Sequence, residues 1–487
     1  MTRAKHRIRE IEMSNALSAR FPRPQRNSLL LGLRPIQVTL VVAGIISSAL
    51  SLLAGWPAAP RLAGLAAALL CGVIAFGRLE GVPTYRRVVL RAAHVIRTLR
   101  KDQSYRANVL TPRRHGYLQL PGEASSLRIL DTRSSIGAVH DPLRRRLIAV
   151  ARIEGPAHLL QNSDEQDRRV AAYGRMVAGL CQSKRIARAQ ILERTIPDPG
   201  DGLGAWARKR SLDITTTAGA IYGDLLQHAA PAAARHETLF SFALNLDAVS
   251  KEVRKYGGGL AGAMAVLDSE SRAFQTSFAA AGVAGVWLNA ADLASSLRVA
   301  FDPAATWTLA ADIEPVDAAP LGVDAAWDHL RTDSSFHRVY VVTEWPRVRA
   351  MPSFLSPLLL KPGIRRTFSL VLQPVPIGKA LRDARRHQVE RVTDRATRKR
   401  VGQLETEEDR QLDADVAQRE KDLAAGHGDV RWIGLIAVSA DTEEGLDEAC
   451  TEIEIAASQA LLDVRRLVGQ QVEGFLAAAL PFGVGLG

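Results

Sequence analysis

The chain has 487 residues, of which 47% are hydrophobic and 23% are charged. This composition excludes a largely disordered chain and is enough for two or three domains with sizeable cores. The formal net charge is +12, so we expect an anionic neighbour such as a membrane surface, a nucleic acid or an acidic protein. The cysteines, Cys71, Cys181 and Cys450, lie far apart. Their spacing argues against a disulfide framework or a metal site and favours buried free thiols in a reducing compartment.

Two apolar segments follow a basic tail of residues 1–34. Residues 36–55 carry no charge, and about twenty such residues span a hydrocarbon core of roughly 30 Å. A second run, residues 62–77, is shorter and reaches spanning length only if Arg78 extends to the interface. The loop between the runs is short, so we predict an antiparallel transmembrane hairpin over residues 35–79, packed through small side chains. A cleaved signal peptide and a buried hairpin of a soluble protein are the alternatives.

The charges on either side of this hairpin predict its orientation. Residues 1–34 and 78–101 both carry many more Lys and Arg than Asp and Glu, whereas the loop holds only Arg61. The positive-inside rule places both flanks on the cytoplasmic side. We therefore expect a two-pass plasma-membrane protein with cytoplasmic N- and C-termini.

Residues 80–145 are predicted to hold a juxtamembrane helix and a linker. Residues 85–101 alternate Arg with apolar residues at helical spacing, which is typical of an amphipathic helix at an anionic inner leaflet. A plain solvated helix is the alternative. Residues 102–145 are rich in Arg, Pro, Gly and Ser, which indicates a linker with short extended pieces. The residues expected to contact the membrane surface are Arg78, Arg86, Arg87, Arg91 and Arg97.

Strand and helix signals then alternate in a first cytoplasmic α/β domain, residues 146–330. We expect strands at 147–153, 185–194, 239–246 and 283–288, and helices at 164–182, 205–229, 249–280 and 290–300, with glycines 257–259 interrupting the third helix. A second domain, residues 331–487, is predicted from strands at 336–344, 366–373 and 431–439. A last helix, capped by Asp441 with Glu444, is expected to run to about residue 467.

A highly charged stretch, residues 379–425, has no proline and a narrow apolar stripe. It predicts one long helix or a helical pair that projects from the core. A solvated helix face is the simplest interpretation, and a DNA-gripping arm is the alternative, because residues 379–400 are strongly basic. The fold class is therefore an α+β membrane protein, in which α/β sandwich domains of a split βαβ kind follow the hairpin. The two halves are also candidates for a diverged duplication.

The motif search favours a protein that is not an enzyme. The sequence contains no phosphate-binding loop, no H-E-x-x-H pair and no G-x-S-x-G elbow. We therefore assign no catalytic, cofactor-binding or metal-ligating residues and expect no cofactor. An enzyme assembled from residues distant in sequence remains open.

Several short motifs occur in an order that resembles a known family. They are residues 127–130, 149–153, 167–170 with 179–181, 300–303, 354–358 with 366–370, and 425–428. Together they resemble the two-helix membrane proteins encoded in actinobacterial conjugative elements beside a separate secretion ATPase. The resemblance implies a fusion of the small two-helix inner-membrane subunit of type IV secretion with the non-ATPase N-terminal half of the secretion ATPase.

In those ATPases the N-terminal half leads into the motor, and here Ala479–Gly483 stands in that place before the chain ends. The resemblance therefore implies a structural subunit for conjugative DNA transfer that docks a separate ATPase. The implied partners are that ATPase, other channel subunits and further copies of this chain, with anionic lipids at the surface and nucleic acid also open. The alternatives are a membrane component of a type VII (ESX-type) protein secretion translocon and a membrane-bound enzyme of unknown reaction.

Overall fold

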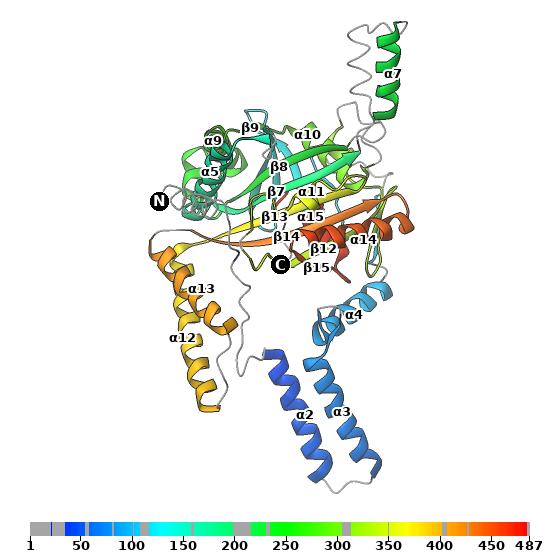
Figure 1. Cartoon of the computed structure of the whole chain (residues 1–487), viewed down its shortest axis with the longest axis vertical. Coiled ribbons are helices and arrows are strands. Elements are labelled where there is room, and N and C mark those ends of the chain that lie inside the picture. Colours follow the sequence, from blue (N-terminus) through cyan, green and yellow to red (C-terminus); the bar gives the residue numbers. More distant parts are fainter. Residues whose placement is uncertain are drawn as a thin grey trace, which may run out of the picture.

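The computed structural model describes most of the chain. The described residues are 21, 35–53, 58–79, 82–100, 102–107, 116–156, 160–197, 216–229, 234–303, 313–348, 350–401, 407–425 and 428–484. A mixed α/β body is built around one large antiparallel sheet, and helical pairs project from it (Figure 1). The mixed α/β fold with an apolar N-terminal helix is therefore confirmed.

The sheet has thirteen strands in the order β3-β10-β11-β12-β14-β13-β7-β8-β6-β5-β4, with β15 also paired to β12 and β9 to β6. Each of these pairings is antiparallel. The strands are β3 Ser104–Arg106, β4 Arg128–Asp131, β5 Gly137–Asp141, β6 Arg146–Glu154, β7 Ile186–Pro197, β8 Ala234–Asn245, β9 Ala284–Trp287, β10 Gly322–Ala325, β11 Leu330–Thr332, β12 Phe336–Glu344, β13 Arg365–Val375, β14 Asp429–Ala440 and β15 Asp463–Arg466.

The two halves of the sheet repeat one topology around the central pair β7–β13, where Ile191 faces Leu370. Outward from this pair, β8, β6 and β5 in the first half correspond to β14, β12 and β11 in the second. The short strands β9 and β15 occupy matching places on β6 and β12. This repeat is what a diverged duplication produces. Because β7 pairs with β13, one sheet contains strands from both sides of the domain boundary that was expected near residue 330.

Helices cover both faces of the sheet because successive residues of each strand place apolar side chains on alternate faces. In β6, Leu147 and Ala149 pack toward α9, whereas Ile148 and Val150 join the core that contains α10 and α15. The second half repeats this arrangement, with α14 packed on the face opposite α15. The helices of the body are α5 Ser163–Gln182, α8 Ser250–Lys255, α9 Gly259–Ala280, α10 Ala290–Phe301, α11 Ser356–Leu359, α14 Glu443–Gln459 and α15 Gln471–Ala479. The helix α7 Thr217–Ala229 stands away from the sheet (Figure 1).

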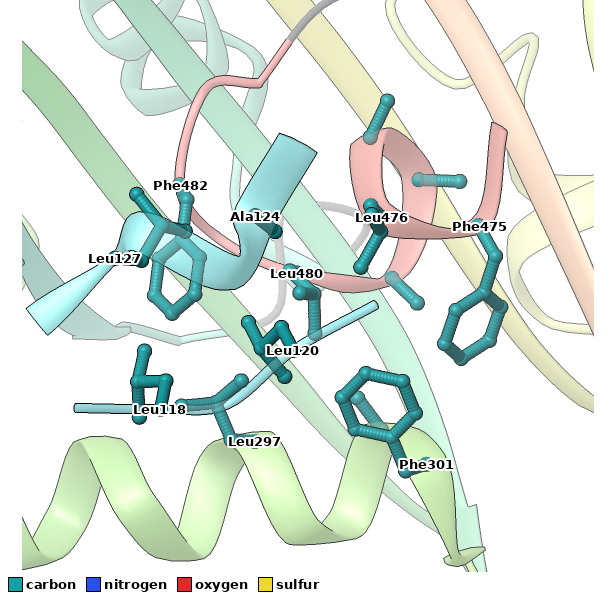
Figure 2. Close-up of a cluster of buried hydrophobic side chains, with 14 of the residues drawn as sticks. Leu118, Leu120, Ala124, Leu127, Leu297, Phe301, Phe475, Leu476, Leu480 and Phe482 are labelled. Atoms are coloured by element: carbon teal, nitrogen blue, oxygen red, sulfur yellow. The ribbon is translucent and has the colours of Figure 1, made fainter. Parts of the chain in front are cut away.

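Residues 116–145, expected as part of a linker, instead belong to the body. They supply β4 and β5 and a loop whose Leu118, Leu120 and Leu127 are fully buried against α10 and α15 (Figure 2). The composition suggested a linker because Pro, Gly and Arg surround these leucines. The burial of these three leucine side chains nevertheless holds the irregular segment in the core.

The C-terminal segment after α15 returns to the centre of the sheet. Leu480 and Phe482 are buried in the same core (Figure 2). Buried Gln190 of β7 accepts a hydrogen bond from Gly483 N (2.7 Å) and donates to the carbonyl oxygen of Leu480 (3.1 Å). Because a buried amide needs such partners, these bonds fix the segment against the central strand pair.

Of the two predictions for the charged stretch 379–425, the helical pair is confirmed, as α12 Ile377–Val401 and α13 Glu407–Ala424. Two other expectations about the second half need correction. Thr442, not Asp441, caps α14 by accepting a hydrogen bond from Gly445 N, and Asp441 instead pairs with Arg365. The helix expected to be the last, α14, ends at Gln459, because the following residues turn back to form β15 on β12, and α15 follows it.

Some expectations lie outside the described residues. They are the tail of residues 1–34 apart from Phe21, the part of the hairpin loop at 54–57, the segment 205–215 of the expected helix 205–229, and the glycine at 426.

Candidate membrane-facing surface

The first component of the candidate surface is a pair of helices, α2 Pro35–Leu53 and α3 Ala58–Phe76, which project from one end of the body (Figure 1). Gln37 Nε2 donates to the carbonyl oxygen of Ala75 (2.8 Å), and Ser47 Oγ donates to that of Gly64 (3.1 Å). These two contacts join the start of α2 to the end of α3 and the middle of α2 to the early part of α3. The helices are therefore antiparallel.

The outward surface of this pair is apolar. α2 carries no charged residue and is long and apolar enough to cross a membrane by length and composition, whereas the apolar part of α3, Arg61–Phe76, is shorter. Large apolar side chains that are exposed on α2 and α3 include Ile36, Val42, Ile45, Ile46, Leu50, Leu52, Leu53, Leu62, Leu65, Leu69, Leu70, Val73 and Phe76. A continuous apolar surface of this kind is unstable in water and marks a membrane or protein contact.

The second component is α4, Thr84–Leu99, which follows α3 through the short strands β1 Arg78–Leu79 and β2 Val82–Pro83. Val88, Val95 and Leu99 are spaced by seven and four residues and are exposed, which places them on one side of the helix. Val89 and Ile96, also exposed, widen this stripe. The apolar stripe of α4 therefore faces away from the body.

The opposite side of α4 is held on the body by polar and aromatic contacts. The guanidinium of Arg91 lies over the Trp327 ring at 4.8 Å, and the His94 ring meets the same ring edge-on at 5.1 Å. Arg97 donates to the carbonyl oxygen of Gly469 (2.7 Å) and pairs with Glu473 (3.1 Å). These contacts fix the rotation of the helix, so the outward direction of its apolar stripe is set by the body.

The predicted surface arginines therefore divide into two groups. Arg78 and Arg86 are exposed. Arg86 also lies near β15. Burial and, after it, the positive charge of Arg86 lower the pKa of Arg465 in that strand. Arg87 is half-buried, whereas Arg91 and Arg97 contact the body as described above. Local periodicity predicted the helix but could not identify which side docks, because the partners lie more than 200 residues later in the chain.

Phe21, which precedes the hairpin, also contacts the body. Its ring centroid lies 5.1 Å from that of Trp345, 5.4 Å from Phe354 and 6.2 Å from Trp432. Aromatic pairs at such separations stabilise a contact beyond the area that they bury. Phe21 before the hairpin and α4 after it are thus both attached to the same body. No signal in the local sequence pointed to this aromatic contact.

Among the described residues, no group of three or more His, Cys, Asp or Glu side chains could hold a metal ion. The most deeply buried histidine, His337, lies between the hydroxyls of Thr332 (2.7 Å from Nε2) and Ser439 (2.8 Å from Nδ1). Burial lowers the pKa of His337 to about 4. At neutral pH His337 is therefore an uncharged core histidine, and each of its ring nitrogens has a hydrogen-bond partner.

Comparison with known proteins adds no identity. No family model matches this sequence, and neither does any curated protein.

Proposed function

We propose that this chain is a structural inner-membrane subunit of a type IV-like conjugative secretion system, which holds a separate secretion ATPase at the membrane. In this proposal α2 and α3 both cross the bilayer, and the N- and C-termini are cytoplasmic. The body is a cytoplasmic platform whose two halves we interpret as split βαβ-like α/β sandwich units. The ATPase, other channel subunits and further copies of this chain are its proposed partners.

The observation that carries the membrane part of the proposal is the outward direction of two adjoining apolar surfaces. The α2–α3 pair exposes apolar side chains around its surface, and the α4 stripe faces away from the body immediately after it. A helix with such a stripe and flanking arginines is suited to the boundary between lipid headgroups and acyl chains. The same polypeptide would therefore cross the bilayer and then lie on its inner surface.

The attachment of both hairpin flanks supports the proposed topology. Phe21 and α4 contact one body, so a chain that crosses the bilayer between them has to return to the same side. An antiparallel pair of spanning helices meets this requirement. The Lys and Arg excess on both flanks favours the cytoplasmic side.

The secretion role itself rests on the motif resemblance and on the form of the body. A continuous sheet with projecting helices and an anchored hairpin suits a protein that positions partners. The direct test is affinity purification of the tagged full chain from detergent-solubilised native membranes, followed by identification of bound proteins. We expect a secretion ATPase that contains a phosphate-binding loop, together with other channel subunits.

Three results would contradict the proposal in different ways. Recovery of the full chain in the soluble fraction without detergent would remove the membrane role. Recovery with small type VII substrates and their ATPase, rather than with a relaxase and a coupling ATPase, would replace conjugative transfer with the type VII alternative. ATP turnover by the purified chain alone would overturn the role as a platform without a motor.

A further inference from the structure

The charged helical pair α12–α13 projects from the body on the same side as α2 and α3 (Figure 1). Its base is fixed to the body by a small apolar cluster of Val375, Ala380, Ala384 and Leu423. An ion pair between Arg419 and Asp429 (2.6 Å) adds a second attachment. The direction of the pair is therefore set by contacts at its base.

One side of α12 is neutralised by α13. Arg391 pairs with Asp413 of α13 at 2.7 Å, and Arg395 pairs with the same carboxylate. Closer to the body, Asp383 of α12 pairs with Arg431 of β14 (3.3 Å). Asp413 is thus paired between the two helices, and Asp383 is paired at their base. We call the α12–α13 pair the arm.

A second ridge of α12 points away from α13. It consists of residues at successive helical spacings of three or four, which places them on one side of the helix. Val389 is 66% exposed and Val392 is 62% exposed in the middle of this ridge. We define the outer ridge as the exposed residues Arg382, Arg385, Val389, Val392, Ala396 and Arg400.

The outer ridge combines positive charge with a small apolar centre. Its arginines lie toward both ends, the two valines and an alanine lie between them, and none of its members is acidic. A surface of phosphate headgroups over acyl chains offers the complementary chemistry, because arginine pairs with phosphate while short apolar side chains enter the interface. A nucleic-acid backbone would use the arginines but would leave the exposed valines without a role.

We propose that the outer ridge of α12 binds the anionic headgroups of the same membrane that the α2–α3 pair crosses. This inference rests on the proposed function, since the hairpin is what brings the arm to the bilayer. The body would then contact the inner leaflet at two places, α4 and α12. Two separated contacts restrict its tilt relative to the bilayer, which a single anchor does not.

The test uses the full chain reconstituted in liposomes, with a polarity-sensitive fluorophore attached at V392C in a Cys71→Ala background. Cys181 and Cys450 are buried and should not label. Ala414, exposed on α13 of the same arm, provides the matched control position A414C. With phosphatidylglycerol in the vesicles, we expect blue-shifted emission and quenching by spin-labelled lipid at position 392. We expect neither change at position 414, and neither at position 392 in phosphatidylcholine alone.

Charge variants then test the ridge itself. Removing a basic residue near an anionic surface weakens attraction by about fivefold. The pair Arg382→Glu and Arg385→Glu should therefore raise the phosphatidylglycerol content needed for half-maximal quenching, whereas Arg382→Lys and Arg385→Lys should leave it nearly unchanged. Equal quenching in the glutamate and lysine variants would overturn the proposal.

A third labelling position separates the two levels of inference. A fluorophore at Leu50→Cys in α2 should be quenched by lipid in both types of vesicle. If position 50 is quenched but position 392 responds only to added DNA, or to nothing, the arm inference fails while the membrane anchor stands. If position 50 is not quenched, the proposed function fails first.

Discussion

The α2–α3 pair and the α12–α13 pair are both pairs of neighbouring helices that extend from one body, but different interactions join them. In α2–α3 hydrogen bonds run from Gln37 and Ser47 to carbonyl oxygens, and the helices approach closely at Gly64. In α12–α13 two arginines share the carboxylate of Asp413.

This difference fits the proposed lipid environment of α2–α3 and an aqueous environment for the space between α12 and α13. Helices in lipid gain little from pressing apolar side chains together, so small residues and hydrogen bonds join them. Helices in water tolerate exposed charge and can be joined by ion pairs across a narrow seam. The apolar exposure of the first pair and the charged surface of the second follow the same division. The introduction of the same charged side chain should therefore affect the two pairs very differently.

The largest expected effect is the introduction of a charge into the apolar pair. Ile46, which is 59% exposed near the middle of α2, should tolerate no carboxylate if it faces lipid. Ile46→Asp should disfavour membrane insertion by about 3 kcal/mol. The measurement is the fraction of full chain that resists alkaline extraction from membranes.

Ala414→Asp in α13, outside the outer ridge, is the matched control for that change. Ala414 is exposed, and surface substitutions usually change stability by less than about 0.5 kcal/mol. Extraction should remain as in the parent chain. If the two aspartate variants behave alike, the two pairs share one solvent and the comparison fails.

The next prediction concerns the body that supports both pairs. Burial lowers the pKa of His337 to about 4, against about 6.5 for an unfolded histidine. Between these values the unfolded chain binds a proton that the folded chain does not, so stability falls as the pH drops from about 6.5 to 4. The loss approaches roughly 3 kcal/mol. Urea unfolding of the detergent-solubilised chain, followed by tryptophan fluorescence between pH 7 and 4, measures it.

His337→Gln removes this titration. The variant should be less stable at pH 7, because the contacts to Thr332 and Ser439 change, but its stability should fall less steeply with acid. Parallel pH profiles for the parent and the variant would exclude His337 as the cause. The loss of stability in acid would then have a different cause in the body.

Strong local periodicity predicted most of the fold. The strand around residues 431–439 and the helix interrupted at glycines 257–259 match β14 and the α8–α9 pair, because alternating or helical apolar spacing extends over their length. The short strand β15 was missed because its pairing with β12 is visible only in the folded chain. The core loop containing Leu118 was missed because apolar contacts, rather than regular structure, hold it.

The candidate surface was predictable in part for the same reason. Arginine spacing indicated an amphipathic helix, and α4 is one. The outward direction of its stripe depends on Trp327 and Glu473, which are distant in sequence. The contact of Phe21 with Trp345 is also long-range. Sequence periodicity describes one element at a time, so it cannot determine which of its sides meets another element.

A smaller effect is expected from the closest approach inside the apolar pair. A Cβ atom added to Gly64 would lie 2.5 Å from Ser51 Cβ, whereas one added to Gly72 meets nothing within 4 Å. Gly64→Ala should therefore push the helices apart at a cost of roughly 1–2 kcal/mol, and Gly72→Ala should be neutral. Disulfide formation between Gln37→Cys and Ala75→Cys, in a Cys71→Ala background, reports the separation. Equal cross-linking in both alanine variants would contradict the close packing.

The smallest effect is expected in the charged pair, where a single carboxylate joins two arginines. Asp413→Asn leaves the shape of the side chain but removes the charge that Arg391 and Arg395 share. Partly exposed ion pairs contribute about 1 kcal/mol or less, and salt screens them. Hydrogen exchange of α13 amides should rise modestly at low salt, and the difference from the parent should shrink at high salt. Because no charge joins α2 to α3 in the described contacts, exchange there should not respond to the same salt change. A salt-independent effect of Asp413→Asn would mean that packing, and not charge, holds the arm together.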